Sequence, residues 1–138
     1  MKHKKAGSTY IIRLDRGEKV IETLTRFCEK RKVRFAHFQG IGTCRRAELG
    51  FFQMEKGRYK FKKLPGDYEI TSLTGNVSPL DGKPFIHAHI VISGSDFLAR
   101  GGHLKEAEVL ATCEIVLCPL PAALVRKPDP GSGLNLWE

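Results

Sequence analysis

Three histidines have the residue type and spacing of a metal site. His87 and His89 stand two residues apart in an apolar segment, residues 85–93, that reads as a β-strand. Side chains two apart on a strand leave the same face, with Cβ atoms about 7 Å from each other. A turn at residues 94–96 would fold the next segment back, so that His103 comes to lie beside the other two.

Three imidazoles on one ion, with water in the fourth position, are an arrangement that zinc adopts. The sequence therefore predicts a divalent metal, with zinc preferred, on His87, His89 and His103. The alternative is that the three are partly buried polar side chains with no ligand. A cupin-type site is disfavoured, because it needs a glutamate shortly after His-x-His, where this chain has residues 93–95, Ser-Gly-Ser.

Two carboxylates interrupt segments that otherwise read as buried strands. Glu69 lies in residues 68–76 and Glu114 in residues 111–117. Such a carboxylate either sits on an exposed strand face or is held by a partner. In the second case Glu69 or Glu114 would orient a histidine ligand, or act as a base on metal-bound water. The sequence leaves both readings open.

The chain is basic, with 23 lysines and arginines against 15 acids and a formal charge of +8. This excess favours association with phosphates or acidic partners and has no bearing on the fold. Arg58, Lys60 and Lys62 alternate with aromatic residues and are the candidate nucleic-acid contacts. The alternative is a solvated sheet face, because the alternation turns Tyr59 and Phe61 away from the basic side chains.

The elements that must position these residues follow from hydrophobic periodicity. Apolar residues at helical spacing predict one amphipathic helix at about 16–31, opened by a capping box of Asp15 and Glu18. A period of two elsewhere predicts strands, among them 8–14, 58–63, 68–77, 85–93 and 109–117. A bend is expected at Gly101-Gly102. The predicted fold class is α+β, a mainly antiparallel β-sheet with one principal α-helix against it.

Length and composition set the remaining bounds. With 138 residues, the chain is expected to be a single domain, 1–138, with a core at about 8–120 and an irregular, proline-containing tail at 121–138. No apolar run approaches the roughly 20 residues of a membrane-spanning helix, and no signal peptide is recognised. The four cysteines form no Cys-x-x-Cys motif, so buried thiols in a reducing cytoplasm are expected.

Motifs of common enzymes are missing. The chain has no phosphate-binding Gly-x-x-x-x-Gly-Lys loop and no Gly-x-Ser-x-Gly elbow, and Gly40-Ile41-Gly42 lacks the third glycine of a dinucleotide site. No catalytic residue is assigned, and the sequence favours a role without catalysis. Three histidines with an open coordination position are nevertheless also a usual catalytic arrangement.

Several short motifs occur in order: Gly40-Ile41-Gly42, residues 68–76, residues 81–89, and Gly101-Gly102-His103-Leu104. Over about residues 8–120 the chain resembles the plants-and-prokaryotes-conserved (PPC) domain, which also forms the C-terminal part of plant AT-hook nuclear-localized proteins. The His-x-His and Gly-Gly-His elements place the resemblance in the prokaryotic branch.

The resemblance implies an α+β domain that assembles as a homotrimer, and a metal held at the histidines in some members. It also implies DNA binding by similarity to the plant proteins, although the Arg-Gly-Arg-Pro core of an AT-hook does not occur here. The expected function is that of a homotrimeric, zinc-binding PPC domain protein. The alternatives are a DNA-binding or regulatory protein acting through its basic surface, and an interaction scaffold.

Overall fold

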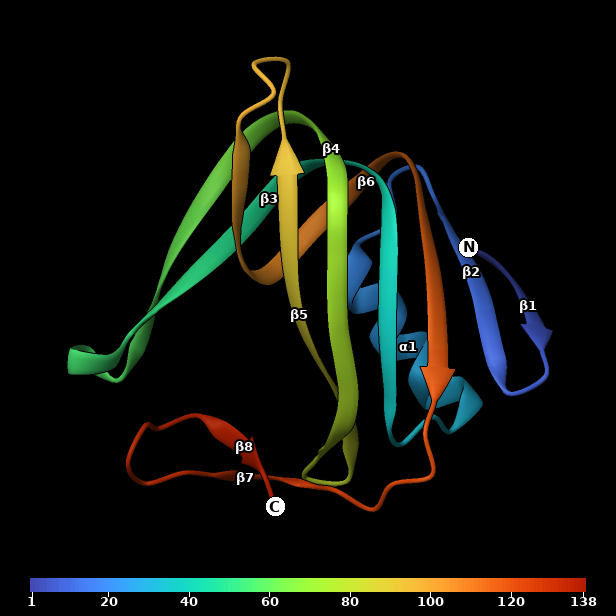
Figure 1. Cartoon of the computed structure of the whole chain (residues 1–138), viewed down its shortest axis with the longest axis vertical. Coiled ribbons are helices and arrows are strands. Elements are labelled where there is room, and N and C mark those ends of the chain that lie inside the picture. The colour runs from blue at the N-terminus through green and yellow to red at the C-terminus, as the bar shows by residue number, and fades with distance from the viewer.

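The computed structural model describes residues 1–138 and confirms the α+β class, with one helix against a mainly antiparallel sheet (Figure 1). All strand pairs are antiparallel except that between β4 and β7. The elements follow in the order β1 (Lys2–Ala6), β2 (Thr9–Asp15), α1 (Val20–Arg31), β3 (Ala36–Gln53), η1 (Met54–Lys56), β4 (Arg58–Leu80), β5 (Lys83–Ser93), β6 (Ala99–Pro119), β7 (Arg126–Pro128) and β8 (Asn135–Trp137).

The helix begins later than the sequence pattern predicts, at Val20 instead of about residue 16. The capping-box contact forms, because the Glu18 carboxylate accepts the Asp15 N–H at 2.7 Å, but it closes a turn before the helix. Gly17 in this turn has φ +84°, which an α-helix does not allow. The helix is not long and apolar enough to cross a membrane.

The strands are longer than the sequence pattern predicts. The segments at 58–63 and 68–77 form one continuous strand, β4, and β3 likewise runs unbroken for 18 residues. β3 bends through register shifts between Gly40 and Gly42 and between Arg45 and Ala47. A Cβ at Gly42 would lie 2.2 Å from the Thr112 carbonyl oxygen, so only glycine allows β6 this close to the bend.

The bent strands close on themselves. β3 pairs with β4 and β6, and β5 pairs with both β4 and β6, so these four strands form a closed circuit of pairing. A turn after β5, in which Phe97 N–H donates to the Gly94 carbonyl at 2.9 Å, leads directly into β6. Gly101-Gly102 does not form the predicted bend. It lies inside β6 and pairs with β5.

The core lies between α1 and the inner face of the sheet, and Figure 1 shows the helix behind the strands. The tail contains two short paired strands, β7 and β8, where the sequence predicts irregular chain. The largest fully buried side chains come from β2, α1 and the four strands of the circuit; they are Phe38, Ile12, Leu14, Leu24, Leu73, Ile90, Ile92, Ile115, Leu117, Val20, Val77 and Val109.

We predict that Gly75→Ala destabilises the protein by about 1–3 kcal/mol through overpacking. A Cβ there would lie 2.4 Å from the His87 carbonyl oxygen and 2.5 Å from Cζ of the buried Phe38 ring. Urea unfolding measures the effect. In the control Gly94→Ala, the new Cβ meets nothing closer than 3.5 Å, so we expect a change within about 0.5 kcal/mol. Equal midpoints for the two variants would contradict this packing.

Candidate metal centre

The alternation of β5 sets the direction of its two histidines. Ile86, Ala88 and Ile90 are 7%, 1% and 1% exposed and face the core. Because successive side chains on a strand point to opposite faces, His87 and His89 both leave the sheet on the side away from the core. The apolar run that suggested a strand therefore also fixes which way the two imidazoles point.

Strand pairing adds the third histidine. His103 lies directly opposite His89 in the register of β5 and β6. The ring centroids are 5.4 Å apart for His87–His89, 5.3 Å for His87–His103 and 5.6 Å for His89–His103. One ring nitrogen from each histidine lies within 4.8 Å of the other two. The structure thus brings together all three residues that the sequence singled out.

The environment keeps two of the imidazoles neutral. Burial lowers the pKa of His87 to about 4, and the neighbouring positive charges of His103, Arg126 and His89 add to this effect. Burial, and then the charge of His89, also lower the pKa of His103. A neutral imidazole is the form that binds a metal, so at neutral pH His87 and His103 need lose no proton to become ligands.

The donor set fits a transition-metal ion. His103 Nδ1 is buried and has no hydrogen-bond partner in the protein. In a tetrahedral zinc site with bonds of about 2.0–2.1 Å, ligand atoms lie about 3.3 Å apart, a spacing within reach of ring rotation from 4.8 Å. Imidazole suits zinc and its neighbours in the transition series, whereas magnesium and calcium prefer oxygen ligands.

Aromatic side chains cover one flank of the cluster. The Tyr59 ring lies over the His103 ring, with centroids 4.7 Å apart and planes at 31°, and Phe52 packs edge-on against Tyr59 at 5.1 Å. Gly50 pairs with His103 from the other side of β6. A Cβ on Gly50 would lie 2.9 Å from the Tyr59 ring, so the absence of a side chain there makes room for this cover.

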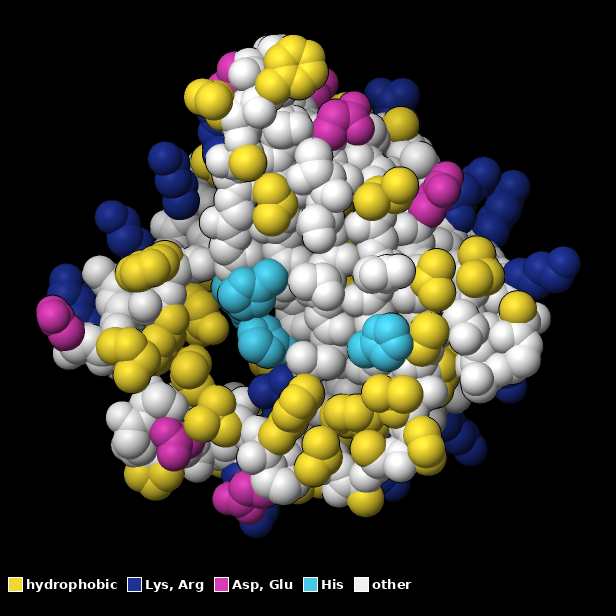
Figure 2. Space-filling model, in the orientation of Figure 1, with side chains coloured by type: hydrophobic (Ala, Val, Ile, Leu, Met, Phe, Trp, Pro, Cys, Tyr) yellow, Lys and Arg dark blue, Asp and Glu magenta, His cyan; other side chains and the backbone are white.

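A cavity of about 240 Å³ adjoins the cluster. Figure 2 shows histidine side chains at the rim of a hollow that is bordered by hydrophobic side chains. Its lining includes His87, His103 and Tyr59, together with Arg126 and Leu136 from the tail. Arg126 is not predicted from the sequence, because its proline-containing segment has no periodicity from which docking against the sheet could be inferred.

The two carboxylates that the sequence singled out, Glu69 and Glu114, lie outside the histidine cluster. Glu69 is exposed and pairs with Ser93 and Thr43, four residues along β5 from His89. Glu114 is exposed and pairs with Arg13 and Ile41, eleven residues along β6 from His103. Neither belongs to the cluster, and the polar residue paired with His87 is Asn76.

The three basic residues predicted as nucleic-acid contacts are exposed, and they line two different cavities. Arg58 lines the cavity beside the histidines. Lys60 and Lys62 line a separate groove of about 390 Å³, which also includes Arg100 and the exposed Phe51.

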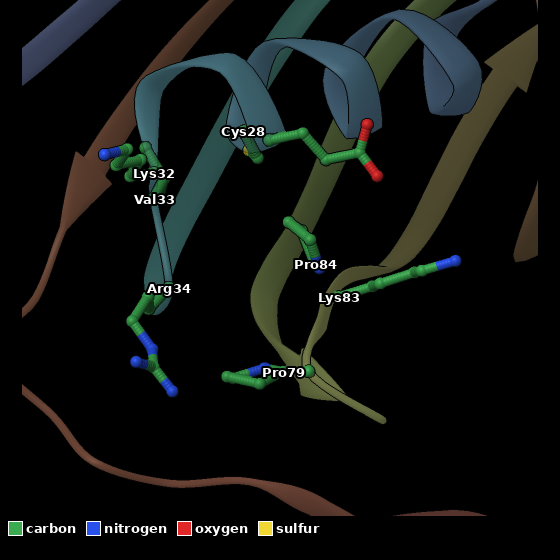
Figure 3. Close-up of a pocket in the computed structure, with 9 residues that line it drawn as sticks. Cys28, Lys32, Val33, Arg34, Pro79, Lys83 and Pro84 are labelled. Carbon is green, nitrogen blue, oxygen red and sulfur yellow. The ribbon is translucent and has the colours of Figure 1, made fainter.

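A further cavity, of about 430 Å³, lies between the end of α1 and the β4–β5 turn (Figure 3). The side chains of Lys32, Arg34 and Lys83 there point away from one another and do not converge on a common point. Burial raises the pKa of the Cys28 thiol to about 12, so at neutral pH this group is an unreactive thiol. This cavity therefore offers neither a metal site nor a nucleophile.

The fold and site together define a small domain with a closed circuit of antiparallel strands and three histidines on its outer face. Residues 1–121 match the family model of the Plants and Prokaryotes Conserved (PCC) domain, and the chain belongs to this family, which is also abbreviated PPC. Comparison with curated protein sequences finds no match.

Solved structures of similar proteins support the assignment. A PPC protein from Pyrococcus horikoshii is 40% identical with a TM-score of 0.91, covering 99% of this chain and 93% of that one. A metal-containing protein from Archaeoglobus fulgidus is 39% identical with a TM-score of 0.90, covering 97% and 95%. A protein from Bacteroides thetaiotaomicron, described as a candidate DNA-binding protein, is 29% identical with a TM-score of 0.96, covering 99% and 96%.

Proposed function

We propose that this chain is a metal-binding PPC domain protein in which His87, His89 and His103 hold one divalent ion, with zinc preferred. The observation that carries the proposal is the convergence of three ring nitrogens within 4.8 Å. The low pKa of His87 and the unpartnered Nδ1 of His103 support it, and so does the metal in the relative from Archaeoglobus fulgidus. Three protein ligands leave a fourth position for water or an exogenous ligand.

We predict that the full chain, purified without a histidine tag, contains about one zinc per chain by mass spectrometry. His103→Ala should bind zinc at least 100-fold more weakly, because it leaves only two ligands. The matched control is His37→Ala, an exposed histidine on β3 outside the cluster, which should retain the metal. Wild-type protein that takes up no divalent metal on titration would refute the proposed function.

We also propose the homotrimer that the family resemblance implies. Exposed apolar side chains gather on three neighbouring strands: Ile11 on β2, Val116 on β6 and Ile41 on β3 are 47%, 37% and 60% exposed. Ile11 pairs with Val116, and the three line a shallow groove of about 720 Å³. An exposed apolar patch of this kind suits a subunit contact.

If this patch is the subunit contact, Ile41→Asp should shift the sedimentation coefficient from that of a trimer to that of a monomer. A buried carboxylate without a partner disfavours association. Phe97→Asp, which changes a still more exposed apolar side chain in the β5–β6 turn, 88% against 60% for Ile41, should leave the trimer intact. A wild-type chain that sediments as a monomer would contradict the assembly.

The second candidate function is DNA binding, and the groove lined by Lys60, Lys62 and Arg100 favours it. Three basic side chains in one groove can neutralise several phosphates, and the exposed Phe51 beside them could stack on a base. The relative from Bacteroides thetaiotaomicron is described as a candidate DNA-binding protein.

If the groove binds DNA, Lys60→Glu/Lys62→Glu should weaken binding at least tenfold and reduce its salt dependence by about two counter-ions. Fluorescence anisotropy at several salt concentrations measures both quantities. The control Lys2→Glu/Lys4→Glu makes the same change of charge on the exposed strand β1. Equal losses in the two double variants would show a non-specific effect of net charge.

The free, mostly buried cysteines are consistent with a reducing compartment, which we propose is the cytoplasm. All four are free, and Cys28, Cys44 and Cys113 are buried. Burial raises the pKa of each of these three thiols to about 12. They therefore serve as apolar core residues and not as disulfide partners or metal ligands.

A further inference from the structure

Arg126 is a buried cation without an anionic partner. It is 8% exposed and takes part in none of the ion pairs of the structure. Its hydrogen bonds all go to neutral groups: Nε donates to Ser78 Oγ at 2.7 Å, Nη1 to the Asn135 carbonyl at 2.6 Å, and Nη2 to Asn76 Oδ1 at 2.8 Å. A charge that is desolvated and unpaired is costly, and an anion would offset this cost.

The guanidinium is held rigidly with donors to spare. It lies over the rings of Phe85 and Trp137, at 5.2 Å and 5.4 Å from their centroids. Three of its five N–H groups donate within the protein, which leaves one on each terminal nitrogen. Two N–H donors are also the number that one carboxylate engages in a bidentate pair.

Arg126 and the histidine cluster share one cavity. The cavity of about 240 Å³ is lined by His87 and His103 and also by Arg126. Aromatic and aliphatic side chains form much of the remaining wall, among them Phe52, Phe85 and Leu134. At about 30 Å³ per water, the space equals roughly eight waters, which is enough for a small organic molecule.

We propose that this cavity binds a small organic acid whose carboxylate pairs with Arg126 and whose other polar atom reaches the metal held by the histidines. The proposal rests on the metal centre proposed above. A carboxylate fits better than a phosphate, because the two remaining donors of Arg126 match two oxygens and one negative charge, and the other cationic side chain at this cavity, Arg58, is exposed to solvent. The apolar walls would contact the carbon skeleton.

The tail determines this selectivity. Arg126, Leu134 and Asn135 all lie beyond residue 121, where the match to the family model ends. The metal ligands lie within the matched residues, whereas the proposed anion-binding group lies in the C-terminal extension beyond them.

The test uses Co²⁺-loaded full-length protein, because the visible absorption of Co²⁺ reports a ligand at its open position. Glycolate carries a carboxylate and a hydroxyl, and glycolamide is its neutral analogue. We expect glycolate to bind wild-type protein at least tenfold more tightly than glycolamide, and also more tightly than inorganic phosphate. Equal binding of glycolate and glycolamide would overturn the proposal, and tighter binding of phosphate would overturn the carboxylate assignment.

Variants locate the effect. Arg126→Gln should weaken glycolate binding at least tenfold while metal content stays at the wild-type level. The control Arg16→Gln, which removes an exposed guanidinium in the turn before α1 and away from this cavity, should change glycolate binding less than twofold. Unchanged glycolate affinity in Arg126→Gln would refute the role of this residue. Should this variant fail to fold, titration of metal-free wild-type protein with acetate and acetamide, observed through the Arg126 Nε–H signal, still decides.

Failure of the proposed metal centre can be distinguished from failure of the proposed anion site. If the chain takes up no metal, the anion site is tested on metal-free protein through the NMR signal of the Arg126 Nε–H. Acetate should shift this signal and acetamide should not. A signal that acetate leaves unmoved would overturn the carboxylate site independently of the metal.

Discussion

The pairing of β5 with the beginning of β6 is the constraint on which the site depends. This short antiparallel contact, five residue pairs from His89–His103 to Ser93–Ala99, closes the circuit of four strands and sets two imidazoles side by side. The register matters as much as the pairing, because a slip by one residue would turn His103 toward the core. Buried Leu104, 2% exposed, holds the register by occupying the core side of β6.

The sheet face away from the helix therefore bears the histidine cluster, and the hydrophobic core on the other face stabilises the fold. Glycines allow neighbouring groups to approach the backbone closely at two places: where β3 bends, and where an aromatic ring packs over the histidine cluster. Gly42 admits β6 against the bend of β3, and Gly50 leaves space for Tyr59 above His103. The C-terminal extension completes the surroundings of the histidines from outside the circuit of strands. Its Arg126 donates hydrogen bonds to Ser78 and Asn76 of β4. Sheet and tail together give a polar cluster with aromatic walls.

Local patterns predicted the fold class, the helix and the face of β5 that bears His87 and His89, because alternation over a few residues determines all three. They did not predict that β3 and β4 run unbroken, because bulges and an in-strand Gly66 look like turns in the sequence. The positions of Glu69 and Glu114 depend on cross-strand register, which no local pattern contains. The position of Arg126 depends on the tertiary docking of the tail against the sheet. Sequence periodicity does not predict it, because docking is likewise not contained in a local pattern.

The bonding around Ser78 has a practical consequence for observing the molecule. Ser78 Oγ accepts from both Arg126 Nε and Trp137 Nε1, at 2.7 Å and 3.1 Å. Trp137 is the sole tryptophan of the chain and also packs against Phe35 at 5.6 Å. Its indole is thus a built-in fluorophore whose emission reports whether the C-terminal segment is seated on the sheet.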